Sequence, residues 1–258
     1  MDASTKIISG GGRFIYPQGD SYWTQVLADG TYEIEIDWLM RRATHRPYGM
    51  IDAGANFGYW SIVATSGSYG RHSTIAIEAG KANYEWLVLN SRTNGNCFQT
   101  LHRAVLDQSG RWVPLYGKRH AGLSLRTDWH PADSDRFEDV ETITLDDAAA
   151  QYLPKRRHPV LVKLDIEGEE IKGFQGAGQL IDEGALIIYE DHGKESTHAV
   201  SRFVLTLDDM VVWCVDAHRG PTQITAIEQV ARIKTVPTTG YNFFAHRRGS
   251  SWHSLFEG

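Results

Sequence analysis

The sequence has little cysteine, no long apolar run and no surplus of positive charge, and each shortage argues against a class of protein. Its two cysteines, Cys97 and Cys214, lie far apart, each beside apolar residues and without the His or Cys spacing of a metal site. We interpret them as buried thiols in a reducing compartment, although a disulfide between them stays open.

The longest apolar runs, such as residues 185–189, have the length of a strand and are too short to cross a bilayer. No apolar targeting segment follows the polar residues 1–6. We therefore expect no membrane association and a cytoplasmic location.

Acidic residues outnumber basic ones, with 32 Asp and Glu against 26 Lys and Arg and a net charge of −6. A protein that holds a nucleic-acid backbone usually carries a basic surplus. The short basic clusters at residues 155–157 and 247–248 are typical of solvated loops. We expect no nucleic-acid partner.

What the sequence does contain is a regular alternation of apolar strand-sized segments with amphipathic helical segments. Strands are predicted at residues 50–52, 74–78, 98–106, 160–165, 185–190, 211–215 and 241–246, and helices at 32–44, after 58, at 83–92, 145–152, 166–176 and 198–207. Such alternation predicts an α/β, Rossmann-like fold, with a mostly parallel seven-stranded sheet and helices on both faces. The last two strands are expected to pair antiparallel.

The predicted domain organisation is simple. Residues 1–13 are expected to form a flexible tail, and residues 14–258 a single domain. Within that domain, residues 14–49 form an N-terminal extension, and residues 110–144 an inserted hairpin region.

A nucleotide-like binding motif follows the first strand of the alternation. It reads Asp52-x-Gly54-x-Asn56-x-Gly58 and places a glycine turn before a helix N-terminus. The Gly-x-Gly-x-x-Gly pattern of dinucleotide enzymes, whose amides bind a pyrophosphate, is absent. An acid before the turn suits a ligand with a cation, such as S-adenosylmethionine, which carries an ammonium and a sulfonium but no phosphate.

A second acid lies where a ribose would bind. Glu78 ends the next predicted strand, 20 residues after Gly58 (78 − 58), the distance at which a carboxylate accepts the ribose hydroxyls in a βαβ unit. The alternative is that Asp52 and Glu78 are ordinary strand-end acids on a scaffold that binds something else.

At this point the chain resembles a known family, the FkbM-type methyltransferases. The blocks that carry the resemblance are residues 51–59, Glu78 with Asn83-Tyr84 and Asn90, residues 144–147, residues 163–170 and residues 188–192, in that order. Ala79-Gly80 departs from the family, which usually has a proline there. The resemblance implies a class I methyltransferase fold and O-methyl transfer from S-adenosylmethionine to a sugar, a glycan or a secondary metabolite. The cofactor-binding residues predicted are Asp52, Gly54, Asn56, Gly58, Glu78, Ala104 and Asp165.

Catalytic candidates follow from the rule that ligands bind at the carboxyl ends of parallel strands. Asp165 and Glu190 lie there, and Glu167 and His192 come within two residues of those ends. Asp165 is a candidate general base or a ligand of the methionine ammonium, and His192 is the other candidate base. Asp165 with Glu190 or Asp191 also supplies the oxygen ligands of a Mg²⁺ site, although a metal-free site shows the same acids and is favoured.

The acceptor pocket is expected to come from aromatic side chains and from the insertion. The candidates are Trp23, Tyr32, Trp60, Trp112, Trp129 and Ser124.

Three other functions are less consistent with the sequence. An N- or nucleic-acid methyltransferase is disfavoured because an Asn- or Asp-Pro-Pro-aromatic motif is missing at residues 165–168. A non-catalytic S-adenosylmethionine-binding protein has no need of the acids after the fourth and fifth strands. A nicotinamide-dependent oxidoreductase is disfavoured by the missing glycine pattern.

Overall fold

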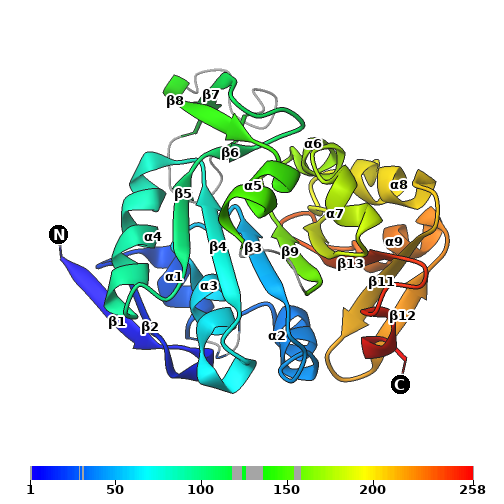
Figure 1. The fold of residues 1–258 in the computed structure, drawn as a ribbon, viewed down its shortest axis with the longest axis horizontal. Helices are drawn as coiled ribbons and strands as arrows, with labels where there is room; N and C mark the ends of the chain where they lie inside the picture. The colour runs from blue at the N-terminus through cyan, green and yellow to red at the C-terminus, as the bar shows by residue number, and fades with distance from the viewer. Residues whose placement is uncertain are drawn as a thin grey trace.

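The computed structural model describes residues 2–28, 30, 32–117, 124–125, 136–153 and 158–257. Its centre is an eight-stranded sheet in the order β12-β11-β13-β10-β9-β3-β4-β5 (Figure 1). The strands are β3 (Gly49–Ala53), β4 (Ser73–Glu78), β5 (Gln99–His102), β9 (Val160–Leu164), β10 (Leu186–Glu190), β11 (Met210–Asp216), β12 (Gly220–Ile224) and β13 (Asn242–Arg247).

Strands β10, β9, β3, β4 and β5 run parallel, and β13, β11 and β12 pair antiparallel at one end. The predicted Rossmann-like α/β architecture is confirmed, including the antiparallel pairing of β11 with β13. The predicted strand number of seven is wrong, because β12 adds an eighth strand at the edge. This strand begins Gly220-Pro221 and buries only Ile224, so it lacks the apolar alternation that marks a strand.

Helices cover both faces of the sheet (Figure 1). One face carries α1 (Ser21–Val26), α2 (Ile34–Arg42), α3 (Tyr59–Thr65) and α4 (Lys81–Thr93), and the other α5 (Leu145–Tyr152), α6 (Glu170–Gln175), α7 (Gly178–Asp182), α8 (Ala199–Thr206) and α9 (Ile227–Ile233). Single 3₁₀ turns lie at η1 (Ser9–Gly11), η2 (Gly67–Tyr69) and η4 (His253–Leu255). The described helices include none that is long and apolar enough to cross a membrane.

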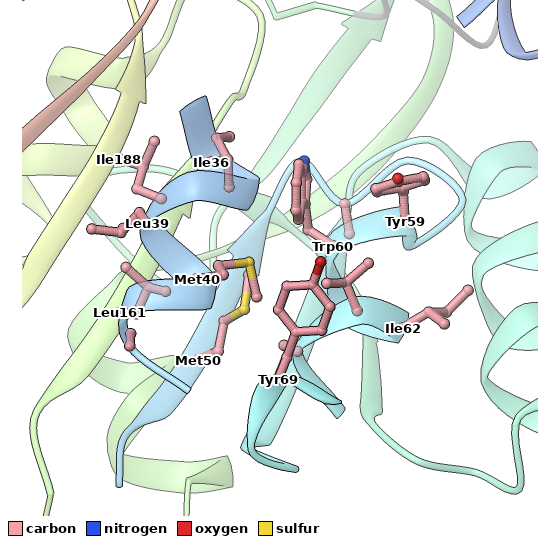
Figure 2. Packing of buried hydrophobic residues seen from close by; sticks show 14 of the residues in the cluster. Ile36, Leu39, Met40, Met50, Tyr59, Trp60, Ile62, Tyr69, Leu161 and Ile188 are labelled. Atoms are coloured by element: carbon pink, nitrogen blue, oxygen red, sulfur yellow. The ribbon is translucent and has the colours of Figure 1, made fainter. Parts of the chain in front are cut away.

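Alternation along the strands divides the core into two layers. On one face, Leu161 of β9 and Ile188 of β10 pack in the same cluster as Met40 of α2 (Figure 2). Their neighbours Val162 and Ile187 pack on the other face. A strand buried on both faces needs apolar residues at nearly every position, which is why these segments read as continuous apolar runs.

The N-terminal residues differ from the predicted flexible tail. Residues 3–7 form β1 (Ala3–Ile7), which pairs antiparallel with β2 (Arg13–Pro17). Two asparagines fasten the hairpin: Asn90 of α4 exchanges hydrogen bonds with the backbone of Ile15, and Asn94, which caps the C-terminus of α4, with that of Arg13. The hairpin itself was not predicted, because β1 is polar and exposed, so its sequence shows no burial pattern.

A small second sheet in the order β6-β8-β7 lies beyond the edge of the main sheet. It consists of β6 (Ala104–Val105), β7 (Trp112–Tyr116) and β8 (Arg136–Ile143). The strand predicted over 98–106 is therefore divided, with β5 in the main sheet and β6 in the small one. Within the predicted insertion, β7 and β8 pair antiparallel.

Candidate active site

A cavity of about 260 Å³ opens at the carboxyl ends of β3, β4, β9 and β10. All the predicted cofactor and catalytic residues except Gly58 line it, namely Asp52, Gly54, Asn56, Glu78, Ala104, Asp165, Glu167, Glu190 and His192. Residues spread over 140 positions of the chain (52 to 192) thus meet at one edge of the sheet, because parallel strands end together there.

The turn after β3 approaches β9 very closely. Gly54 has φ +77°, and a Cβ atom there would lie 1.6 Å from the carbonyl oxygen of Asp165. The turn therefore requires glycine both for its backbone conformation and for its contact with the neighbouring strand. Gly58, at the N-terminus of α3, packs against Leu87 outside the cavity, where a Cβ atom would lie 2.6 Å from Cδ1. Gly58 therefore contributes to the packing of α3 against α4 and does not border the cavity.

Glu78 joins the glycine turn to the start of α4. Its Oε2 accepts a hydrogen bond from the backbone of Asn56 at 2.9 Å, and its Oε1 accepts from the backbone of Gly80 at 2.8 Å and the side chain of Asn83 at 3.2 Å. Burial raises the pKa of Glu78 to about 7, although these donors act in the opposite direction. The carboxylate is thus held rigidly at the strand end, facing the cavity.

A buried lysine with its acids forms the floor of the cavity. Lys163 and Asp165 lie two residues apart on β9 and its end, so they share a face, and Lys163 Nζ lies 2.8 Å from Asp165 Oδ2. Glu33, at the start of α2, approaches the same ammonium to 3.9 Å. These acids raise the pKa of Lys163 well above its usual range, against the effect of burial. Lys163 therefore stays protonated and cannot act as a proton acceptor.

Glu33 is a residue that sequence reasoning missed. Its carboxylate accepts hydrogen bonds from the Trp60 indole at 2.5 Å and from the Asn242 side chain at 3.0 Å. It thereby connects the N-terminal extension to α3 and β13 beneath the site. No spacing in the sequence relates these three segments, so there was no signal to find.

Asp52 is nearly closed off from solvent, with 1% of its surface exposed. Its Oδ2 accepts a 2.6 Å hydrogen bond from the Ser61 hydroxyl of α3. Burial raises its pKa, and the charge of Lys163 opposes that rise. The side chain therefore supports the turn from within the protein as well as bordering the cavity.

Two carboxylates that line the cavity, those of Glu167 and Glu190, accept no hydrogen bond from the described residues. Burial, then the charge of Asp165, raises the pKa of Glu167 to about 8 and that of Glu190 well above its usual range. Glu167 also has φ +54°, an uncommon backbone conformation for a residue with a side chain. Its carbonyl accepts a 2.6 Å hydrogen bond from Ser124 of the insertion.

His192 lines the cavity next to these acids, but its geometry differs from that of a base. The backbone N–H of Lys194 donates to His192 Nδ1 at 3.0 Å, which places the proton of the neutral ring on Nε2. Burial lowers the pKa of His192, so the ring is neutral near pH 7. A neutral ring in this tautomer offers a donor to a ligand.

Asp191 faces away from the cavity. Its carboxylate forms a fully buried ion pair with Lys234 and accepts a hydrogen bond from the backbone of Ser201 at 3.1 Å. The hypothesis that Asp191 binds a metal is therefore wrong. Across the described ranges, no group of three or more His, Cys, Asp or Glu side chains is arranged to hold a metal ion.

Aromatic side chains form one wall of the cavity. They are Tyr22, Trp23, Tyr32, Tyr59 and Trp60, from the N-terminal extension and α3. The predicted members Trp23, Tyr32 and Trp60 and the predicted Ser124 do line the cavity, whereas Trp112 is 70% exposed on β7 and does not. The other candidate, Trp129, lies outside the described residues.

The profile of the methyltransferase FkbM domain matches residues 52–210, more than half of the chain. A search of curated proteins found no match.

Matches to solved structures are of low identity. The methyltransferase FkbM of Methylobacillus flagellatus is 13% identical with a TM-score of 0.49; the match covers 78% of this chain and 43% of that one. An O-methyltransferase of Bacillus cereus, in complex with S-adenosylhomocysteine (SAH), is 10% identical with a TM-score of 0.48 and coverages of 88% and 86%. The chain thus spans less than half the length of the M. flagellatus protein.

Proposed function

Because the chain belongs to the FkbM family of methyltransferases, we propose that it transfers a methyl group from S-adenosylmethionine to a hydroxyl of a sugar, a glycan or a small secondary metabolite. The observation that carries this proposal is the cavity itself. A turn and an acid suited to an adenosyl ligand lie there beside aromatic rings and two carboxylates, those of Glu167 and Glu190, that accept no hydrogen bond from the described residues.

The donor half of the cavity runs from β4 to β9. We assign Glu78 to the ribose hydroxyls, and Ala104, which follows the residue whose N–H donates to the Glu78 carbonyl, to the adenine. The turn at Gly54 and the Asp165 carboxylate border the space for the methionine part, whose ammonium an acid would hold. When bound, S-adenosylmethionine supplies a methyl group on a positively charged sulfur.

The chain has to orient the acceptor oxygen and accept its proton. Among the candidates, Glu167 fits the base best, because it lies two residues after Asp165 and its carboxylate accepts no hydrogen bond from the described residues. With a pKa of about 8, it is a stronger base than an ordinary carboxylate, and the fraction able to take a hydroxyl proton rises as the pH approaches 8. His192, with its proton on Nε2, is suited to donate to the acceptor instead.

The test is an assay with S-adenosylmethionine and a panel of sugars and hydroxylated metabolites, with the product's methylated atom assigned by NMR. We expect an O-methyl product, and we expect Glu167→Gln to lower kcat by about 100-fold, within the range of general-base catalysis, with unchanged affinity for SAH. The matched control is Glu85→Gln, an exposed acid of α4. Methyl transfer to nitrogen, or full activity of Glu167→Gln, would contradict the proposal.

A further inference from the structure

The cavity has a second half, on the β10 side, that the donor does not account for. Its lining includes Tyr32 and Trp60 as well as Glu190 and Gly240. Gly240 allows the Glu190 side chain to lie there, because a Cβ atom on Gly240 would come within 1.6 Å of Glu190 Oε1. The carboxylate is therefore packed against bare backbone and directed into the cavity.

The charge in this cavity is not balanced by the protein. The described lining residues include six acids, Asp52, Glu78, Asp165, Glu167, Glu169 and Glu190, and two cations, Lys163 and Arg103. Both cations are already paired, Lys163 with Asp165 and Arg103 with Glu141.

The ionised form of Glu190 is strongly disfavoured in these surroundings. Burial, together with the charges of Asp165 and Glu167, raises its pKa well above the usual range, and Lys163 compensates only in part. A carboxyl whose ionisation is this unfavourable gains most from a cation placed beside it.

Aromatic side chains line the same cavity. The ring of Tyr32 is stacked on that of Trp60, at 23° and with centroids 6.2 Å apart, and Trp60 is fixed by its hydrogen bond to Glu33. Trp60 is only 2% exposed, so the half-buried Tyr32 presents the ring that a ligand reaches. An aromatic face attracts both the C–H face of a ring and a nearby cation. The combination of the accessible Tyr32 ring and a carboxylate that accepts no hydrogen bond from the described residues thus favours a ring that carries a positive charge.

We propose that the acceptor is a hydroxylated ring bearing a protonated amine, of the amino-sugar type, with its ammonium on Glu190 and its ring along Tyr32. This inference rests on the proposed function and specifies its substrate class. The ammonium forms a charge-assisted hydrogen bond, which is about twice as strong as a neutral one. Phosphorylated or carboxylated sugars are repelled by the acids. A protonated amine has no lone pair, so the hydroxyl remains the nucleophile.

Binding to the SAH-saturated protein tests the inference directly. The probes are glucosamine, glucose and glucuronate, measured by calorimetry below the pKa of the amine. We expect glucosamine to bind at least about tenfold more tightly than glucose, which corresponds to one charge-assisted bond. Glucuronate is expected to bind more weakly than either.

Glu190→Gln keeps the shape of the side chain and removes its charge. It should reduce the preference for glucosamine over glucose to less than about threefold, whereas Glu85→Gln should keep it, because that acid is exposed on α4. Equal binding of glucosamine and glucose to the unaltered protein, or a preference that survives in Glu190→Gln, overturns the inference.

Turnover separates this inference from the proposed function. If glucosamine is preferred through Glu190 but the methyl group is found on nitrogen, the substrate class stands and the proposed O-methylation fails. If neutral sugars are O-methylated as efficiently as amino sugars, the proposed function stands and the inference fails.

Discussion

Replacing Glu78 with glutamine is expected to weaken the binding of SAH without unfolding the protein. Both oxygens of Glu78 already accept hydrogen bonds from the chain, two at Oε1 and one at Oε2. The amide nitrogen of glutamine donates and does not accept. The orientation with the fewest conflicts places this nitrogen at the Oε2 position, facing only the N–H of Asn56.

In that orientation, one acceptor for a ribose hydroxyl is lost. A hydrogen bond to a charged group contributes about 1.5–3 kcal/mol, which corresponds to a rise of about 10- to 140-fold in Kd. The turn at Asn56 loses a hydrogen bond as well, so the free energy of unfolding should fall by about 1–3 kcal/mol.

Calorimetry with SAH measures the affinity, and urea unfolding of the ligand-free protein measures the stability, with Glu85→Gln as the control. The unaltered protein should also lose stability as pH rises from about 4.5 to about 7, because burial raises the pKa of Glu78 in the folded state. This loss should be smaller in Glu78→Gln. A folded variant whose Kd lies within about threefold of the unaltered protein would refute the ribose assignment.

Three further predictions concern other parts of the structure. Gly240→Ala should lower kcat/KM for the acceptor by about tenfold with SAH affinity unchanged, because the added Cβ displaces the Glu190 carboxylate. If the variant and the unaltered protein have the same kcat/KM, Glu190 does not contribute to acceptor binding. Lys234→Met should destabilise the fold by about 3–5 kcal/mol in urea unfolding by leaving Asp191 buried without its cation, and adding Asp191→Asn should restore most of that loss. Burial lowers the pKa of His246, so the free energy of unfolding should fall as pH drops below about 6.5, and a similar slope in His246→Phe would contradict this cause.

Local patterns in the sequence determined much of the fold and the donor site. The helix over 145–152 was predicted at its observed bounds, because Thr144 caps it and its apolar residues recur at helical spacing. The glycine turn after residue 52 and the acid at residue 78 were recognisable because each depends on a few neighbouring residues. Parallel strands then bring such strand ends to one edge, whatever lies between them.

Tertiary structure alone decided the acceptor side and the charge balance. Glu190 and Asp191 are neighbours at the end of β10, yet one faces the cavity and the other a buried lysine 43 residues away. The sequence shows that adjacent strand residues point to opposite sides, but not which side is the cavity. Glu33 entered the site from outside the matched domain through contacts with Trp60 and Asn242. Such contacts arise from packing between distant segments, and packing leaves no periodic or spaced signal in the sequence.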